Sequence, residues 1–192
     1  MIIGSVGLKF KKIRNREIIE GNSQKGELPS LFDLNSIWEN KELHKNMQDI
    51  ISQAKAKLLT NPNHSYRLYL RYCLFCLVLT NSKREGVLKN LSLDDWKCKK
   101  EVDSLVHVTV SSHKTAIGGV SHVLISKTDE KIIQDYISYV RPFVTKKNTG
   151  YLFLTIKGEQ ISQTTRMIRI LLSAYDKELD TKNVTITKIR KA

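Results

Sequence analysis

The feature that most constrains the fold is a helix-length segment with no polar face. Residues 65–80 read SYRLYLRYCLFCLVLT, and apolar or aromatic side chains fall on nearly every side of a helix drawn through them. An amphipathic surface helix keeps a polar stripe opposite its apolar one. We therefore expect this segment to be a central, buried helix around which the other elements pack.

A CxxC pair lies inside this segment, formed by Cys73 and Cys76. No second pair of Cys or His ligands follows at a spacing typical of zinc sites. We interpret both residues as thiols in the core of a reduced protein. The sequence predicts no metal and no cofactor.

The flanking patterns predict an α+β fold, mostly helical with a small antiparallel sheet. Helical spacing runs through 31–59, where Asn61-Pro62-Asn63 is expected to stop it, and a short helix is expected over 83–90. Apolar and polar residues alternate at 106–111 and again at 119–126, which predicts a hairpin. Thr128 is the expected N-cap of the next helix, and another is expected over 161–179.

The chain reads as one domain preceded by a basic arm. Residues 1–29 form the predicted arm and linker, and residues 30–192 form the domain. The basic residues of the arm are Lys9, Lys11, Lys12, Arg14 and Arg16. No signal peptide is visible, and the longest apolar run, 73–79, is too short to cross a bilayer. We expect an intracellular protein that does not enter membranes.

Positive charge favours a nucleic-acid partner. The 192 residues contain 32 Lys and Arg against 19 Asp and Glu, which gives a net charge of +13. A surface of this charge attracts polyanions at long range. The charge therefore favours nucleic acid as a partner.

Four stretches, in order, resemble the tyrosine recombinase (phage integrase) family. TNSKREGVLKNLSLDDW resembles the first catalytic box, and VSSHKTAIGGVSHVLIS resembles the hairpin that carries a catalytic lysine. ISYVRPFV with YLFLT, and then VTITKIRKA as the second box, complete the series. The version here is most similar to the Crypton-type transposon recombinases. This resemblance implies the catalytic-core fold of the family and a nuclear location. It also implies double-stranded DNA as the partner, on which a homo-oligomer could form.

The resemblance implies roles for three cations. Arg84 and Arg190 would be the two catalytic arginines, and Lys114 would be the catalytic lysine. Two guanidiniums suit a phosphodiester transition state because each offers bidentate, permanently charged donors to non-bridging oxygens. A lysine on a turn could protonate the leaving 5′-oxygen. The DNA-contacting residues predicted in this way are Arg84, His113, Lys114, Arg166, Arg169, Lys188 and Arg190.

Two departures bear on the chemistry. Thr187, the fourth candidate catalytic residue, stands where the family's second box has histidine. Threonine can hydrogen-bond a phosphate oxygen but cannot shuttle a proton near neutral pH. The family's nucleophilic tyrosine follows the second arginine, whereas all seven tyrosines here precede Arg190. We therefore expect a catalytic domain that is incomplete at its C-terminus, and whether these 192 residues form an enzyme stays open.

Three functions remain possible at this point. The first is the DNA-binding catalytic core of a site-specific recombinase that cleaves and rejoins strands through a 3′-phosphotyrosine in its full-length parent. The second is a transposon-derived, inactive domain that binds DNA or protein. The third is an unrelated basic α+β module that binds nucleic acid, with RNA as one candidate, although the pair of aromatic-rich strands of an RNA-recognition motif is missing. His107, His113 and His122 are interpreted as exposed residues of the hairpin.

Overall fold

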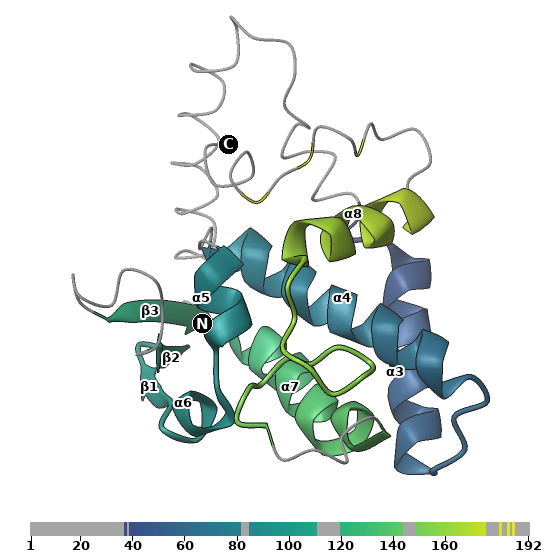
Figure 1. Cartoon of the computed structure of the whole chain (residues 1–192), viewed down its shortest axis with the longest axis horizontal. Helices are drawn as coiled ribbons and strands as arrows, with labels where there is room; N and C mark the ends of the chain where they lie inside the picture. The colour runs from purple at the N-terminus through teal and green to yellow at the C-terminus, as the bar shows by residue number, and fades with distance from the viewer. Residues whose placement is uncertain are drawn as a thin grey trace, which may run out of the picture.

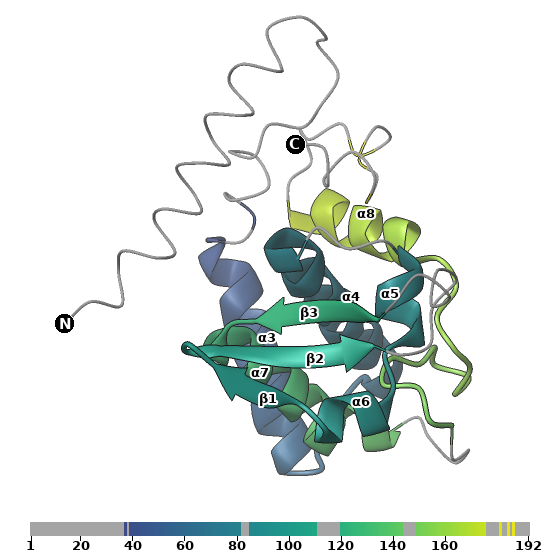
Figure 2. The ribbon, with the colours of Figure 1, turned by 90° about the vertical axis from the view of Figure 1, so that its left-hand side faces the viewer.

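The computed structural model describes residues 37, 39–81, 85–110, 120–143, 149–175, 181, 184 and 186. Helices make up most of this part of the chain, and a three-stranded antiparallel sheet lies at one side of them (Figures 1 and 2). The predicted fold class, α+β with a small antiparallel sheet, is confirmed. The basic arm predicted over 1–29 lies outside the described residues.

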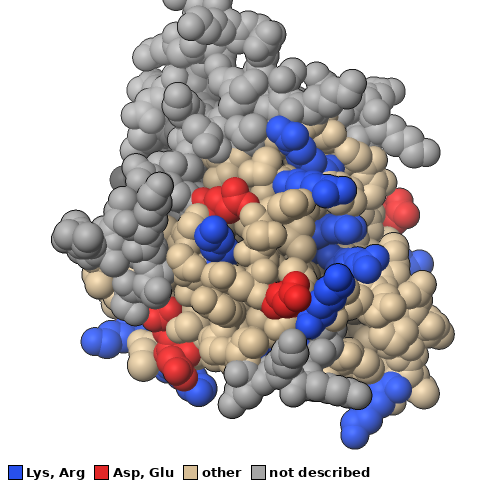
Figure 3. Space-filling model, viewed as in Figure 1, with Lys and Arg blue, Asp and Glu red and all other residues tan. Residues whose placement is uncertain are grey.

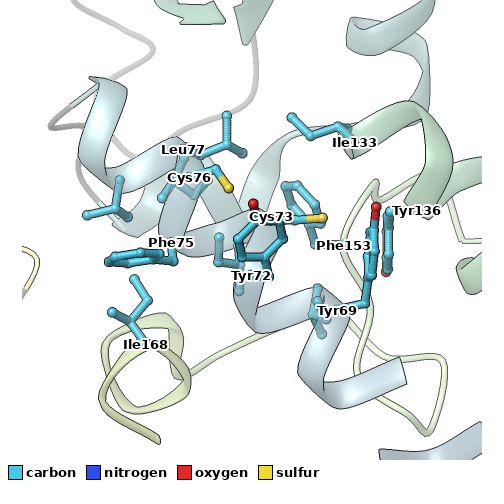
Figure 4. Packing of buried hydrophobic residues seen from close by; sticks show 14 of the residues in the cluster. Tyr69, Tyr72, Cys73, Phe75, Cys76, Leu77, Ile133, Tyr136, Phe153 and Ile168 are labelled. Atoms are coloured by element: carbon cyan, nitrogen blue, oxygen red, sulfur yellow. The ribbon is translucent and has the colours of Figure 1, made fainter. Parts of the chain in front are cut away.

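The central helix is α4, Pro62–Asn81, and it is buried as the sequence predicts. Twelve of its 20 residues are buried, and α3, α7, α8 and β3 all pack against it (Figure 1). In Figure 4, Phe75 lies beside Ile168 of α8. The rings of Tyr136 and Phe153 pack in the same core, tilted by 41° to each other. The two rings have centroids 5.6 Å apart. Burial of this one helix therefore organises the core.

The helix before α4 ends earlier than the sequence predicts, and Pro62 has a different role from the expected one. That helix, α3, covers Lys41–Lys55, and Asn40 caps it by accepting a hydrogen bond from the Leu43 amide at 3.0 Å. It ends before the expected stop, and Lys57 adopts a φ of 57° in the connection. Pro62 begins α4 instead of ending α3. Proline is tolerated in the first turn because its missing N–H has no partner in the helix there.

The sheet contains the predicted hairpin and one strand that the sequence did not reveal. Strands β2, Leu105–Val110, and β3, Ser121–Ile125, pair antiparallel, with Val108 opposite Val123. Strand β1, Lys100–Val102, pairs with β2 at the edge. The two residues between β1 and β2 have φ values of 49° and 69°. Positive φ at both positions is typical of a tight type I′ turn.

The remaining elements surround α4 and the sheet. They are α5 (Glu85–Asn90), α6 (Leu93–Lys97), α7 (Lys127–Asp135), the π-helix η2 (Tyr136–Val140), the 3₁₀ turn η3 (Arg141–Phe143) and α8 (Thr164–Tyr175). The predicted N-cap Thr128 is wrong. Ser126 caps α7 by accepting from the Asp129 amide at 3.0 Å. Residues 176–180, part of the helix expected over 161–179, lie outside the described residues.

A buried pair of tyrosines attaches the 151–154 segment to the core. The hydroxyls of Tyr66 and Tyr136 lie 2.8 Å apart, and the Tyr66 hydroxyl donates to the Leu154 carbonyl at 2.9 Å. Arg141 donates to the carbonyls of Tyr151 and Leu152 at 3.1 and 3.3 Å. This segment is therefore fixed by side chains, since little regular secondary structure holds it.

Asp129 gives a prediction about stability. Its side chain is 1% exposed, and burial raises the pKa of the carboxyl above 3.8, an effect that the Ser126 hydroxyl offsets only in part. A pKa raised by folding means that the ionised form destabilises the folded state. The stability present at low pH is lost as the pH rises through this raised pKa. We expect Asp129→Asn, which stays neutral, to be more stable than the wild type at pH 7.

The measurement is chemical unfolding of both proteins between pH 4 and pH 8. The stability advantage of Asp129→Asn should shrink as the pH falls, because the wild-type carboxyl then becomes neutral too. Asp49→Asn, an exposed position on α3, is the control and should show no such trend. An advantage of Asp129→Asn that is the same at every pH would contradict the assignment.

Candidate nucleic-acid interface

Most of the predicted site residues lie outside the described part of the chain. These residues are Arg84, His113, Lys114, Thr187, Lys188 and Arg190. These residues fall in three segments of the sequence, whose described neighbours are known: Asn81 and Glu85 flank the first, Val110 and Val120 flank the second, and Ile186 precedes the third. The geometry of the site is therefore built from these flanking residues.

The first box and the hairpin are joined by one side chain. Asn81, the last residue of α4, accepts a hydrogen bond from the Leu124 amide of β3 at 2.6 Å. Leu124 is on β3, whose start at Ser121 follows the hairpin loop. The end of α4, which precedes Arg84 in the sequence, and strand β3, which follows Lys114, are therefore held side by side.

The short helix α5, which follows Arg84, is fixed at both ends against the segment that leads into α8. At its start, the Glu85 carboxylate accepts a hydrogen bond from the Thr164 amide at 2.6 Å. At its end, the Gln160 side-chain amide donates to the Lys89 carbonyl at 3.0 Å and to the Asn90 side chain at 2.7 Å. Thr164 is the first residue of α8. The Glu85 carboxylate therefore satisfies an amide with no partner in the helix and places negative charge at the positive end of the helix dipole.

The segment that leads into the second box is fixed to the same helix. Arg169 of α8 donates from Nε to the Val184 carbonyl at 2.6 Å. The hydroxyls of Ser173 and Thr181 lie 2.9 Å apart. Val184 and Ile186 are both buried. Helix α8 thus contacts the flanks of both predicted boxes, and Asn81 connects the first box to the hairpin.

Two of the predicted DNA-binding residues are described, and their surroundings differ. Arg166 is exposed, and it donates a local hydrogen bond to the Gln163 side chain at 3.1 Å. Arg169 is half-buried and uses Nε to hold the backbone at Val184. Arg166 is thus available to a phosphate, whereas Arg169 has a structural partner.

Helices α4 and α8, which pack against each other, supply a basic surface. Arg67 and Arg71 lie on α4, Arg166 and Arg169 lie on α8, and neither helix contains Asp or Glu. Burial lowers the pKa of Arg71, and the neighbouring Arg67 guanidinium lowers it further. Figure 3 shows a band of Lys and Arg side chains on the half of this face that the two helices occupy. Such a band suits a phosphate backbone.

Residues of α3, α4 and α8 line a groove with a volume of about 410 Å³. Asp49 of α3, Arg71 of α4 and Ile170 of α8 are among its lining residues. Neither Arg166 nor Arg169 lines it. Since its walls carry both signs of charge, the groove is a poor match for a polyanion.

The described tyrosines are poorly suited to nucleophilic attack. Tyr66, Tyr69, Tyr72 and Tyr136 are buried, and burial raises the pKa of Tyr66 to about 12 and also raises the pKa of the other three. Tyr139 contacts Lys55 through its ring, and Tyr175 accepts from Asn46 at 2.9 Å. Tyr151 is the exposed member, at 38%.

The CxxC pair is part of the core, as predicted. Cys73 and Cys76 are fully buried, and burial raises the pKa of both thiols. A thiol with a raised pKa is a weak nucleophile and a weak metal ligand. Among the described residues, no three His, Cys, Asp or Glu side chains come together in a way that could hold a metal ion.

The structure bears out the expected exposure of the hairpin histidines only in part. His122 is exposed, and its Nδ1 lies 3.3 Å from the Thr109 hydroxyl. The expectation is wrong for His107, which is half-buried on β2, and His113 lies outside the described residues. Over the described ranges, no helix combines the length and hydropathy needed to cross a bilayer.

Sequence reasoning missed the residues that hold the site together. These are Asn81, Glu85, Gln160 and Ser173. Asn81 and Glu85 lie within the stretch that resembles the first box, but no role was predicted for either. Gln160 and Ser173 carry no signal in the sequence, since their partners lie on other segments.

Comparisons with known proteins add one structural likeness. No protein-family model matches the sequence, and no curated protein matches it. Among solved structures, the chain is similar to the crystal structure of XerA recombinase, with a TM-score of 0.47 and 20% sequence identity. The alignment covers 76% of this chain and 44% of XerA, so it spans less than half the length of that protein.

Glu85 gives a prediction about how the site is held. Glu85→Ala should leave the Thr164 amide without its acceptor and remove the charge at the start of α8. Loss of a helix cap costs about 1 kcal/mol, with a range of about 0.5–2. We expect the free energy of unfolding to fall by that amount in urea titrations. The exposed Glu159→Ala is the matched control, and an equal effect at both positions would refute the role of Glu85.

Proposed function

We propose that this chain is the DNA-binding catalytic core of a tyrosine recombinase of the Crypton type. The observation that carries the proposal is the set of hydrogen bonds that connects the residues flanking the first box, the hairpin and the second box. Asn81 joins the first box to the hairpin strand, Glu85 joins it to α8, and Arg169 joins α8 to the segment before the second box. An arrangement that gathers two arginines and one lysine around a phosphate needs these connections.

The chemistry assigned to the cations follows from phosphodiester cleavage. Arg84 and Arg190 would hold the non-bridging oxygens, where negative charge grows in the transition state. Lys114 would protonate the leaving 5′-oxygen. Arg166, exposed on α8, would contact the flanking backbone. In the full-length parent, a tyrosine hydroxyl would form the covalent bond to phosphorus.

A second candidate is a transposon-derived domain that binds DNA or protein without cleaving DNA. The observation in its favour is Thr187 at the position where the resemblance places histidine. Threonine can hydrogen-bond a phosphate oxygen but cannot act as a base near neutral pH. A second candidate that binds DNA differs from the first in whether strands are cut, and one that binds protein differs from it in DNA binding as well.

DNA binding is expected to be strong at low salt and to show little sequence preference. If about four phosphates are contacted, affinity should fall by roughly 100-fold between 50 and 200 mM salt, because each contact releases a condensed counterion. Fluorescence anisotropy with two unrelated labelled duplexes measures both properties. Arg84→Ala and Arg166→Ala should each weaken binding, whereas Lys97→Ala, which pairs with Asp94 at an exposed position, should not. A wild-type protein that binds neither duplex at 50 mM salt would refute the proposal.

Covalent capture of DNA by these 192 residues is not expected. The buried tyrosines have raised pKa values and are held by the core, so none can lie in line with a phosphorus atom, and positioning is a large part of the rate. The test is incubation with supercoiled plasmid and with a nicked suicide duplex, followed by denaturing gels. Tyr151→Phe is the matched variant because Tyr151 is exposed. A covalent band in the wild type that Tyr151→Phe abolishes would show that Tyr151 is the nucleophile.

A further inference from the structure

Thr181, Val184 and Ile186, the described residues that lead into Thr187, are held by polar contacts with α8 and by burial. Arg169 Nε donates to the Val184 carbonyl at 2.6 Å, and Ser173 and Thr181 share a hydrogen bond of 2.9 Å one helical turn farther on. Val184 is 1% exposed and Ile186 is 4% exposed. Two polar contacts and two buried side chains thus fix this segment just before Thr187.

The geometry of Arg169 differs from that of an arginine that waits for phosphate. Its Nε donor, the one nearest the backbone, is already used by a carbonyl, and the side chain is half-buried. Arg166 lies one turn earlier on the same helix, is exposed and donates a hydrogen bond to the nearby Gln163 side chain. A bidentate clamp on phosphate uses two free donors on one edge of the guanidinium. Arg166 meets this condition better than Arg169 does.

We infer that Arg169 is a positioning residue, which fixes the second box on α8 and acts on DNA through Arg190 instead of touching DNA itself. The inference rests on the proposed function for its consequence, but the contact with Val184 is independent of that function. Arg190 follows Val184 by six residues. Six residues span about 9 Å as a helix and about 20 Å when extended, so holding Val184 limits where the Arg190 guanidinium can reach.

The first experiment tests, in the protein without DNA, whether the contact of Arg169 with the Val184 carbonyl holds the segment in place. Arg169→Met keeps much of the length of the side chain but removes every donor. We expect amide exchange at Thr181, Val184 and Ile186 to become about tenfold faster or more, since a hydrogen bond to a charged group is lost. Exchange at Ile168 and Leu172, buried on α8, should not change. Arg166→Met is the matched control. The inference would be overturned if Arg166→Met also made exchange at Thr181, Val184 and Ile186 faster, or if Arg169→Met left their exchange unchanged.

The second experiment tests the coupling to Arg190 on DNA. Removing one phosphate contact lowers the slope of log affinity against log salt by about 1. If Arg169 acts through Arg190, then Arg169→Met, Arg190→Met and the double variant should each lower the slope by about 1. If the two residues contact separate phosphates, the double variant should lower it by about 2. The pair Arg166→Met with Arg190→Met supplies that additive result as an internal reference.

The two experiments separate failure of the inference from failure of the proposed function. A wild-type protein that does not bind DNA would refute the proposed function, and the exchange result would still decide whether Arg169 holds Val184. Binding with an additive slope for Arg169 and Arg190 would keep the function and overturn the positioning role. Global exchange rates measured in the same samples show whether Arg169→Met is folded. If it is not, Arg169→Lys, which keeps a donor, should restore slow exchange at Val184.

Discussion

The structure depends on the burial of α4 on nearly every side. Burial of apolar surface stabilises the folded state by about 25 cal/mol per Å². A helix that is apolar on every side gains this stabilisation in full only if other elements cover each of its faces. The tyrosines of α4 carry hydroxyls that must be paired when buried. Tyr66 donates to the Leu154 carbonyl, Tyr69 donates to the Ile132 carbonyl of α7, and Tyr72 bonds His44 of α3. Each hydroxyl therefore selects a different element to lie against α4.

The candidate interface depends on a second set of contacts, centred on α8. The N-terminus of this helix receives the carboxylate of Glu85, and its middle presents the guanidinium of Arg169 to a carbonyl of the following segment. Both contacts are charge-assisted hydrogen bonds, which are stronger and more directional than neutral ones. Since α8 also packs on α4, the flanks of the two boxes are attached to the buried core through one rigid helix.

The sequence predicts the elements whose pattern is long and regular. Residues 65–80 are uniformly apolar and the strands of the hairpin alternate, and both were predicted to within a few residues. Strand β1 was missed because its three residues are all exposed and show no alternation. The end of α3 was misplaced because Leu58 and Leu59 continue a helical spacing after the backbone has turned at Lys57. Local pattern does not report a backbone that reverses between two apolar residues.

In the candidate site, too, some features could be predicted from the sequence and others could not. The order of Arg84, Lys114 and Arg190 along the chain is a property of the sequence, so it could be proposed without a structure. The roles of Arg166 and Arg169 could not be distinguished in this way, because positions three apart on a helix lie on nearly the same face. What separates them is the Val184 carbonyl, which arrives from 15 residues away. An arginine beside such an acceptor keeps its charge but loses freedom to follow a ligand, whereas an exposed arginine keeps both. The role of a cation in a basic surface is therefore set by the partners that the fold brings to it, and charge alone does not determine it.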